Sequence, residues 1–168
     1  MTERTDLLHS LRRHRGFLLR TVDGIDDTAA RRRSTVSELT LASILKHVSD
    51  TERAWAQFIV TGPEALGGDV DFSTFDPATF VDTRFVLADD DTLAVLTERY
   101  AAVAAETDAL VSSVDLEAEQ ALPKAPWHEP GASRSARRTF LHIIAETAQH
   151  AGHADIIREA IDGAKTMG

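Results

Sequence analysis

A group of three histidines and one glutamate near the C-terminal end of the chain is spaced so that all four share one face of a helix. They are His142, Glu146, His150 and His153. At about 100° per residue, these four positions and Ile157 fall within an arc of roughly 80°. Histidines and a glutamate that only face water need not share a helix face with an isoleucine. A purely apolar core, in turn, would contain no such polar residues. This face is therefore the best indication of function in the sequence.

Glu146 and His150 have the spacing of a metal-binding pair. Side chains four residues apart on a helix lie one above the other, with about 6 Å between their Cβ atoms, so that a single ion can bridge them. Metal sites in helical bundles take further ligands from facing helices, and His47, beside the apolar stripe of another predicted helix, is the natural third residue. Two imidazoles and a carboxylate suit zinc, iron(II) or nickel better than magnesium or calcium. Three protein ligands also leave a position open for water or substrate.

The same face offers groups that could orient these ligands. We expect His153 to be a closer support than His142, because it lies nearer to the pair on the helix. Each residue also has an ordinary structural interpretation. A histidine beside an apolar stripe, such as His47, is often a buried structural residue, and a Glu–His pair four apart is common on surface helices.

Two further polar residues are candidates for a role in the site or pocket. His14 occupies a seam position of the first predicted helix, and Arg158 is a candidate contact for an anion. The alternative for Arg158 is a surface salt bridge with Asp155 or Asp162. The sequence does not identify a catalytic general base.

Four long segments are predicted as helices, because apolar residues recur three or four apart in each of them. These segments cover residues 4–23, 40–60, 91–114 and 133–163. Thr40 is a suitable N-cap for the second, either Ser133 or Ser135 for the fourth, and Gly163 ends the fourth. No strand-like alternation of useful length occurs. We predict an all-α four-helix bundle that forms a single domain over residues 1–168.

The predicted helices are joined by two long connections and one shorter one. Residues 25–38 are polar and have room for one helical turn, whereas residues 61–90 and 116–133 are long and irregular. Long connections inside a compact domain are usually functional. Because residues 61–90 contain four scattered phenylalanines, we expect them to pack and to shape a substrate pocket.

The composition describes an acidic chain without cysteine. The 168 residues include 27 acidic and 18 basic side chains, for a net charge of −9, which argues against a nucleic-acid partner. The absence of cysteine excludes disulfides, thiolate metal ligands and a cysteine nucleophile. No apolar run reaches the length of about 18 residues that a membrane span needs, and the charged N-terminus lacks the apolar region of a signal peptide. We therefore expect a cytoplasmic protein without a membrane partner.

Three segments of the chain match the pattern of a known family of helical bundles. They are VDGIDDTAARRR (22–33), LTLASILKHVSDTERAW (39–55) and HIIAETAQHAGHADIIREAIDG (142–163). These segments resemble the DinB-like superfamily, in particular its actinobacterial branch of mycothiol-dependent maleylpyruvate isomerases and thiol S-transferases. The resemblance implies a four-helix bundle with a divalent metal at one end. The ligands that it implies are a histidine on the second helix, here His47, and two residues four apart on the fourth, here Glu146 and His150.

The resemblance also implies a reaction. Family members add a low-molecular-weight thiol to an electrophile at the metal, and this chain has no thiol of its own, so we expect mycothiol as cosubstrate and a small electrophile as substrate. The full-length isomerases carry an extra C-terminal domain for which this sequence offers no counterpart, so their exact reaction is not implied. Two alternatives stay open: a metal-dependent hydrolase and a non-catalytic bundle that binds a metal or a small molecule. We also expect a homodimer, since family members often pair.

Overall fold

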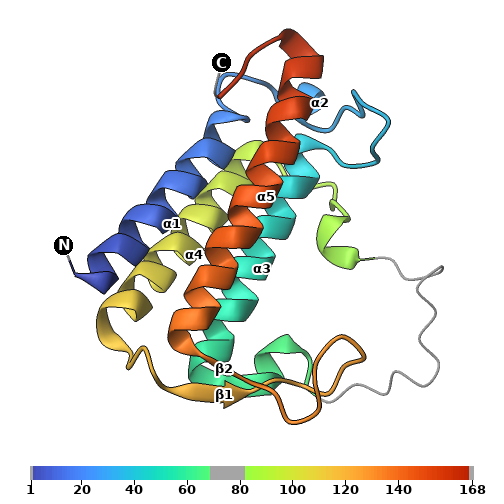
Figure 1. Ribbon diagram of the computed structural model, residues 1–168. Coiled ribbons are helices and arrows are strands. Elements are labelled where there is room, and N and C mark those ends of the chain that lie inside the picture. Colours follow the sequence, from blue (N-terminus) through green and yellow to red (C-terminus); the bar gives the residue numbers. More distant parts are fainter. Residues whose placement is uncertain (1, 69–81, 167–168) are drawn as a thin grey trace.

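The computed structural model describes residues 2–68 and 82–166 and arranges four long helices as a bundle (Figure 1). These helices are α1 (Glu3–Arg20), α3 (Leu41–Thr61), α4 (Leu93–Ser113) and α5 (Ala136–Asp162). α1 packs against α4 and α5, and α3 packs against the same two helices from the other side. The predicted all-α bundle with two long connections is therefore confirmed.

Local capping signals set the ends of the helices. Thr40 and Ser43 form a reciprocal capping box at the start of α3, in which each side-chain oxygen accepts a hydrogen bond from the backbone N–H of the other residue. Ser135, and not Ser133, caps α5, and Gly163 ends this helix with a left-handed φ of 81°. Because these signals are local in sequence, the predicted helix ends agree with the observed ones to within about one turn.

Three short helical segments lie between the long helices. α2 (Asp27–Ala30) is the helical turn predicted for the first connection, and the 3₁₀ helices η1 (Gly62–Leu66) and η2 (Thr83–Phe85) lie in the second. Both 3₁₀ helices contact α3. The expectation that residues 61–90 pack can be examined only at the two ends of this connection, because residues 69–81 lie outside the described residues.

A small pair of strands joins two parts of the chain in which the sequence shows no strand-like alternation. β1 (Glu119–Ala121) pairs antiparallel with β2 (Ser133–Ser135), with Gln120 opposite Arg134. Strands of three residues are too short to produce a recognisable alternation of polar and apolar residues. The pair ties the connection between α4 and α5 directly to the first turn of α5, since β2 ends where that helix begins.

The core consists of two apolar clusters with a layer of polar residues between them. On each long helix, a buried polar residue separates the apolar residues of one cluster from those of the other. The polar layer consists of Arg15, Glu52, Thr107 and Thr147, one residue from each long helix. The seam position predicted for His14 is occupied by its neighbour Arg15, which is 5% exposed.

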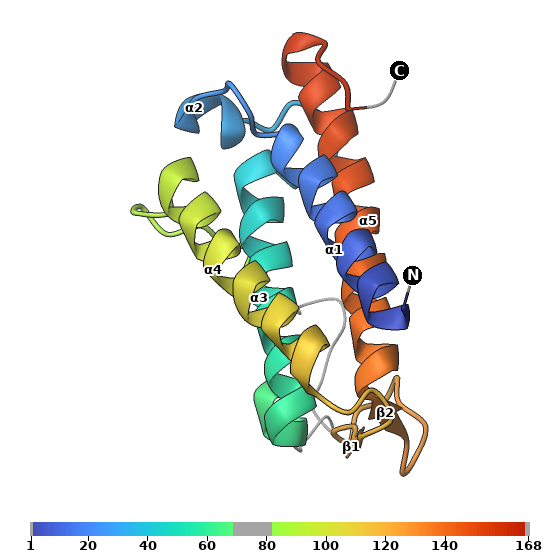
Figure 2. The ribbon, with the colours of Figure 1, turned by 90° about the vertical axis from the view of Figure 1, so that its left-hand side faces the viewer.

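The two ends of the bundle differ in what covers them. Figures 1 and 2 show α2 and the C-terminal end of α5 at one end and the β1–β2 pair at the other. None of the helices in the described part of the chain is both long enough and apolar enough to cross a membrane.

Candidate metal centre

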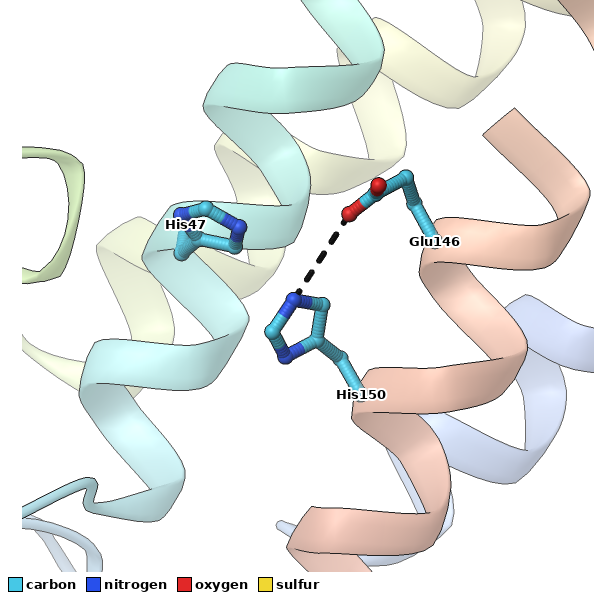
Figure 3. A group of neighbouring side chains, drawn as sticks. All are labelled: His47, Glu146 and His150. Carbon is cyan, nitrogen blue, oxygen red and sulfur yellow. Dashed lines mark ion pairs between the residues drawn. The ribbon is translucent and has the colours of Figure 1, made fainter. Parts of the chain in front are cut away.

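His47, Glu146 and His150 come together between α3 and α5. Each offers one ligand atom, and these three atoms lie within 4.8 Å of one another. Nε2 of His150 is 3.7 Å from Oε2 of Glu146. Figure 3 shows the three side chains converging on the space between the two helices. The residues lie part-way along both helices, and not at the extreme end of the bundle that the family resemblance implies.

The two imidazoles are neutral at pH 7 in this environment. Burial, with smaller contributions from the neighbouring His150 and Arg84, lowers the pKa of His47 to about 4, although Asp82 and Asp50 act in the opposite direction. Burial, followed by the charges of His153 and Arg84, also lowers the pKa of His150. A neutral imidazole has a lone pair available for a metal, so neither ligand has to lose a proton before it binds one.

The donor set fits a divalent cation. His47 and His150 are 5% and 8% exposed, and within the described residues the Nδ1 atoms of both rings are buried without a hydrogen-bond partner. The half-buried Glu146 adds a negative charge between them. Two nitrogens and one carboxylate oxygen are ligands typical of zinc, nickel or iron(II).

The two histidines expected to support the ligands contact different members of the group. Nε2 of His142 is 3.7 Å from Oε1 of Glu146, and its ring packs edge-on against Trp55 with 4.6 Å between centroids. His153 is exposed and contacts the ring of His150 edge-on at 5.7 Å. The structure therefore makes His142, and not His153, the histidine beside the Glu146 carboxylate. The sequence-based expectation used only the positions of the two histidines relative to Glu146 and His150 on one helix. It could not include the contact of His142 with Trp55, which lies on α3.

His14 and Arg158 lie among other partners. The His14 ring packs edge-on against Phe17 on its own helix. Arg158 forms an ion pair with Asp162 and donates hydrogen bonds to the carbonyl oxygens of Thr21 and Asp23 beyond the end of α1. Of the two interpretations of Arg158, the ion pair with Asp162 is the one that the structure shows, and the cation also stabilises a helix C-terminus.

The segment that contains η2 adds residues that the sequence did not reveal. The Phe85 ring stacks on the His47 ring with 3.8 Å between centroids and 7° between planes. Oδ2 of Asp82 is 3.9 Å from Nδ1 of His47, and the Thr51 hydroxyl is 3.5 Å from Nε2 of the same ring. Thr51 stands four residues after His47 on α3, so helical spacing alone could have identified it. Asp82 and Phe85 belong to a segment without periodicity, which offers no such signal.

A cavity of about 480 Å³ opens beside the three converging residues. His47 and Glu146 contribute to its lining, and Trp55 and Trp127 form aromatic parts of its wall. The Arg134 guanidinium lies 4.5 Å from the centre of the Trp55 ring. A cavity of this size accommodates a small organic molecule. The remaining wall comes from η1, η2 and the connection between β1 and β2, so both long connections shape the space.

Comparisons with known proteins agree with the fold and identify the family. A crystal structure described as "the conserved protein of locus from Enterococcus faecalis" superposes with a TM-score of 0.70 over 98% of this chain and 99% of that one, at 13% sequence identity. This likeness supports the fold alone. The comparison with curated proteins gives no match. The family model described as Mycothiol-S-transferase matches residues 6–163. The chain belongs to the mycothiol S-transferase family.

Proposed function

We propose that the protein joins a low-molecular-weight thiol, mycothiol in the first instance, to a small electrophile at a divalent-metal site formed by His47, Glu146 and His150. The observation that carries the proposal is the convergence of these three residues, two of which, His47 and Glu146, line a cavity of about 480 Å³. The family to which the chain belongs supports the choice of thiol. Because the chain contains no cysteine, the thiol has to arrive as a second substrate.

Zinc is the ion that we propose first, with nickel and iron(II) as alternatives, since all three accept two imidazoles and a carboxylate. A divalent ion held by these residues supplies the charge that keeps a thiol deprotonated at neutral pH. In the reaction, the thiol proton passes to solvent and a sulfur lone pair forms the new S–C bond. In a substitution the leaving group departs with the bonding electrons, and in an addition the electrophile takes them and then a proton from solvent.

The residues of the chain hold and surround the reactants. His47 and His150 enter the site as neutral ligands because burial lowers the pKa of both. Trp55 and His142 supply an apolar and aromatic wall that excludes water from one side of the cavity, whereas Thr51 and Arg84 add polar groups to it. Such a combination of a mostly apolar wall and a few polar groups orients a small substrate.

The metal site is tested by the metal content of the purified protein, measured by mass spectrometry. We expect close to one equivalent of zinc, nickel or iron in the wild type and a large loss in His150→Ala. His14→Ala is the matched control, because it removes a histidine from α1 and leaves the three converging residues intact. A wild-type protein that is empty and also refuses added zinc would refute the metal site.

The reaction is tested with the metal-loaded protein, mycothiol and a chromogenic aryl halide. We expect formation of the thioether to depend on thiol, on metal and on His150. Conversion of an ester or amide substrate without any thiol would instead support the hydrolase. A protein that binds metal and mycothiol without turnover over a broad set of electrophiles would be the non-catalytic bundle.

Pairing of two chains stays a prediction. The alanine-rich middle of α4 offers a surface for it: Ala101, Ala102 and Ala105 are exposed, and Ala104 is half-buried. Light scattering coupled to gel filtration checks the prediction, with a mass of about 37 kDa expected for two chains of 18.4 kDa each.

A further inference from the structure

The residues from Asp82 to Phe85 lie against the His47 ring, and the Phe85 ring also lies 5.9 Å from that of His150, centroid to centroid. Phe85 covers the face of the His47 imidazole, and the Asp82 carboxylate lies beside its Nδ1 atom. In Figure 3, one ring nitrogen of His47 points toward the space shared with Glu146 and His150, and the other points away from it. Because Nδ1 is the atom beside Asp82, Nε2 is the atom left for the shared space.

The Asp82 carboxylate is itself held in place by Arg84. Nε of Arg84 lies 2.9 Å from Oδ1, Nη2 lies 2.6 Å from Oδ2, and the backbone N–H of Arg84 donates to Oδ1 at 3.0 Å. Although burial opposes it, these bonds hold the pKa of Asp82 below its usual range. The carboxylate is therefore ionised at neutral pH and accepts hydrogen bonds only.

An ionised Asp82 favours a proton on Nδ1 of His47, and a second contact favours the same arrangement. Nη1 of Arg84 donates a hydrogen bond to the Thr51 hydroxyl at 3.2 Å, and that hydroxyl lies 3.5 Å from Nε2 of His47. Since Arg84 can only donate, the Thr51 oxygen accepts from it and its own hydrogen is free to point at Nε2. An Nε2 atom that faces a donor carries a lone pair, and the proton of the neutral ring then lies on Nδ1.

We propose that Asp82 is a positioning residue for the metal site: it accepts a hydrogen bond from Nδ1–H of His47 and so fixes the tautomer in which Nε2 presents its lone pair to the ion. The pair is 3.9 Å apart, so a shift of the carboxylate by about 1 Å closes it to a direct hydrogen bond. Metal-binding histidines commonly donate their second N–H to a carboxylate in this way, which sets ring orientation and raises ligand basicity. The inference deepens the proposed function and rests on its metal site.

The tautomer is measured directly by ¹⁵N NMR of the His47 ring in the metal-free protein, a readout that needs neither metal nor activity. We expect the wild type to carry its proton on Nδ1. Asp82→Ala should shift the population toward the Nε2–H tautomer, which ordinarily predominates in free neutral imidazole side chains. A wild-type ring protonated on Nε2 would overturn the proposal, whatever the protein does with metals.

The effect on binding is measured by competition for zinc against a chromophoric chelator, with circular dichroism as the check on folding. Loss of a group that supports a metal ligand typically weakens affinity by about 10-fold to 100-fold, and we expect this for Asp82→Ala. Asp82→Asn keeps an acceptor and should lose less. Asp50→Asn is the matched control. The Asp50 carboxylate also raises the pKa of His47 through its charge, but it pairs with Lys46 and Arg53.

The outcomes separate this proposal from the proposed function. If wild-type protein binds zinc and Asp82→Ala binds it equally well, Asp82 has no positioning role and the metal site stands. If Asp50→Asn loses as much affinity as Asp82→Asn, net charge accounts for the effect and the positioning role is refuted. If wild-type protein does not bind zinc, the proposed function fails, and the NMR result still decides which nitrogen of His47 is protonated.

Discussion

Arg15 and Glu52 form a buried ion pair in the middle of the bundle, with side chains 6% and 1% exposed. Nε of Arg15 donates to Oε2 of Glu52 at 3.1 Å, and a second bond joins Nη2 to the other carboxylate oxygen. The Arg15 guanidinium also reaches Asp108 on α4 at 2.8 Å. The pair thus fixes α1 against α3 at the residue that directly follows Thr51.

We expect the loss of one member of this pair to destabilise the protein strongly. Glu52→Ala leaves a buried guanidinium without its main partner, and such changes cost about 3–5 kcal/mol. The double variant Arg15→Met/Glu52→Leu removes both charges and fills the space with apolar groups, so we expect it to lose much less. Urea unfolding of the three proteins measures the difference. Single and double variants of equal stability would show that the pair is not buried as the structure has it.

Zinc is expected to stabilise the wild type against heat. A ligand that binds only the folded state at about 1,000 times its dissociation constant adds about 4 kcal/mol, or roughly 10 °C in Tm for a chain of this size. Differential scanning fluorimetry with added zinc, and then with excess chelator, checks the shift and its reversal. His14→Ala should respond as the wild type does. The idea fails if His150→Ala shows the same shift, because zinc would then bind elsewhere.

The metal-free protein is expected to lose stability in mild acid. Burial is the main cause that lowers the pKa of His47 and of His142 from 6.5 to about 4 in the folded state. Between these values the unfolded chain binds protons that the folded chain does not, so stability is full above pH 6.5 and decreases as the pH falls to about 4.

At pH 5, unfolding should therefore take up about two protons from solvent, one on each of these two imidazoles. Urea unfolding at several pH values, in the presence of chelator, gives this number from the slope of stability against pH. His142→Gln removes one of the two groups and should have a shallower slope. An unchanged slope in that variant would mean that His142 is protonated in the folded protein.

His142 and His153 are expected to differ in their effect on the metal site. His142 lies 3.7 Å from the Glu146 carboxylate, whereas His153 is exposed. His142→Ala should weaken zinc affinity by about 10-fold, at the lower end of the range for supporting groups, and His153→Ala should stay close to the wild type. Chelator competition on both variants decides between the sequence-based expectation for His153 and the contact that the structure shows for His142.

The features that could be predicted from the sequence are those that depend on residues close together in the chain. Helix ends depend on caps such as Thr40 and Ser135, and the pairing of Glu146 with His150 depends on a spacing of four residues, so both could be predicted. Arg15 and Glu52 could not, because a charged residue in a helix normally faces solvent and only a partner 37 residues away makes its burial possible. Asp82 and Phe85 were missed for a similar reason: their positions depend on the path of an irregular connection.

Trp55 is expected to report on the occupation of the cavity. The chain has two tryptophans, and Trp127→Phe leaves Trp55 as the single fluorophore, packed against His142 and under the Arg134 guanidinium. Because Trp55 lines the cavity beside the metal centre, titration of the zinc-loaded variant with mycothiol should give a saturable change in its fluorescence. The matched variant Trp55→Phe reports from Trp127, which is 62% exposed at the cavity rim, and should respond less. Binding of mycothiol that is measured by calorimetry but leaves Trp55 fluorescence unchanged would place the thiol outside this cavity.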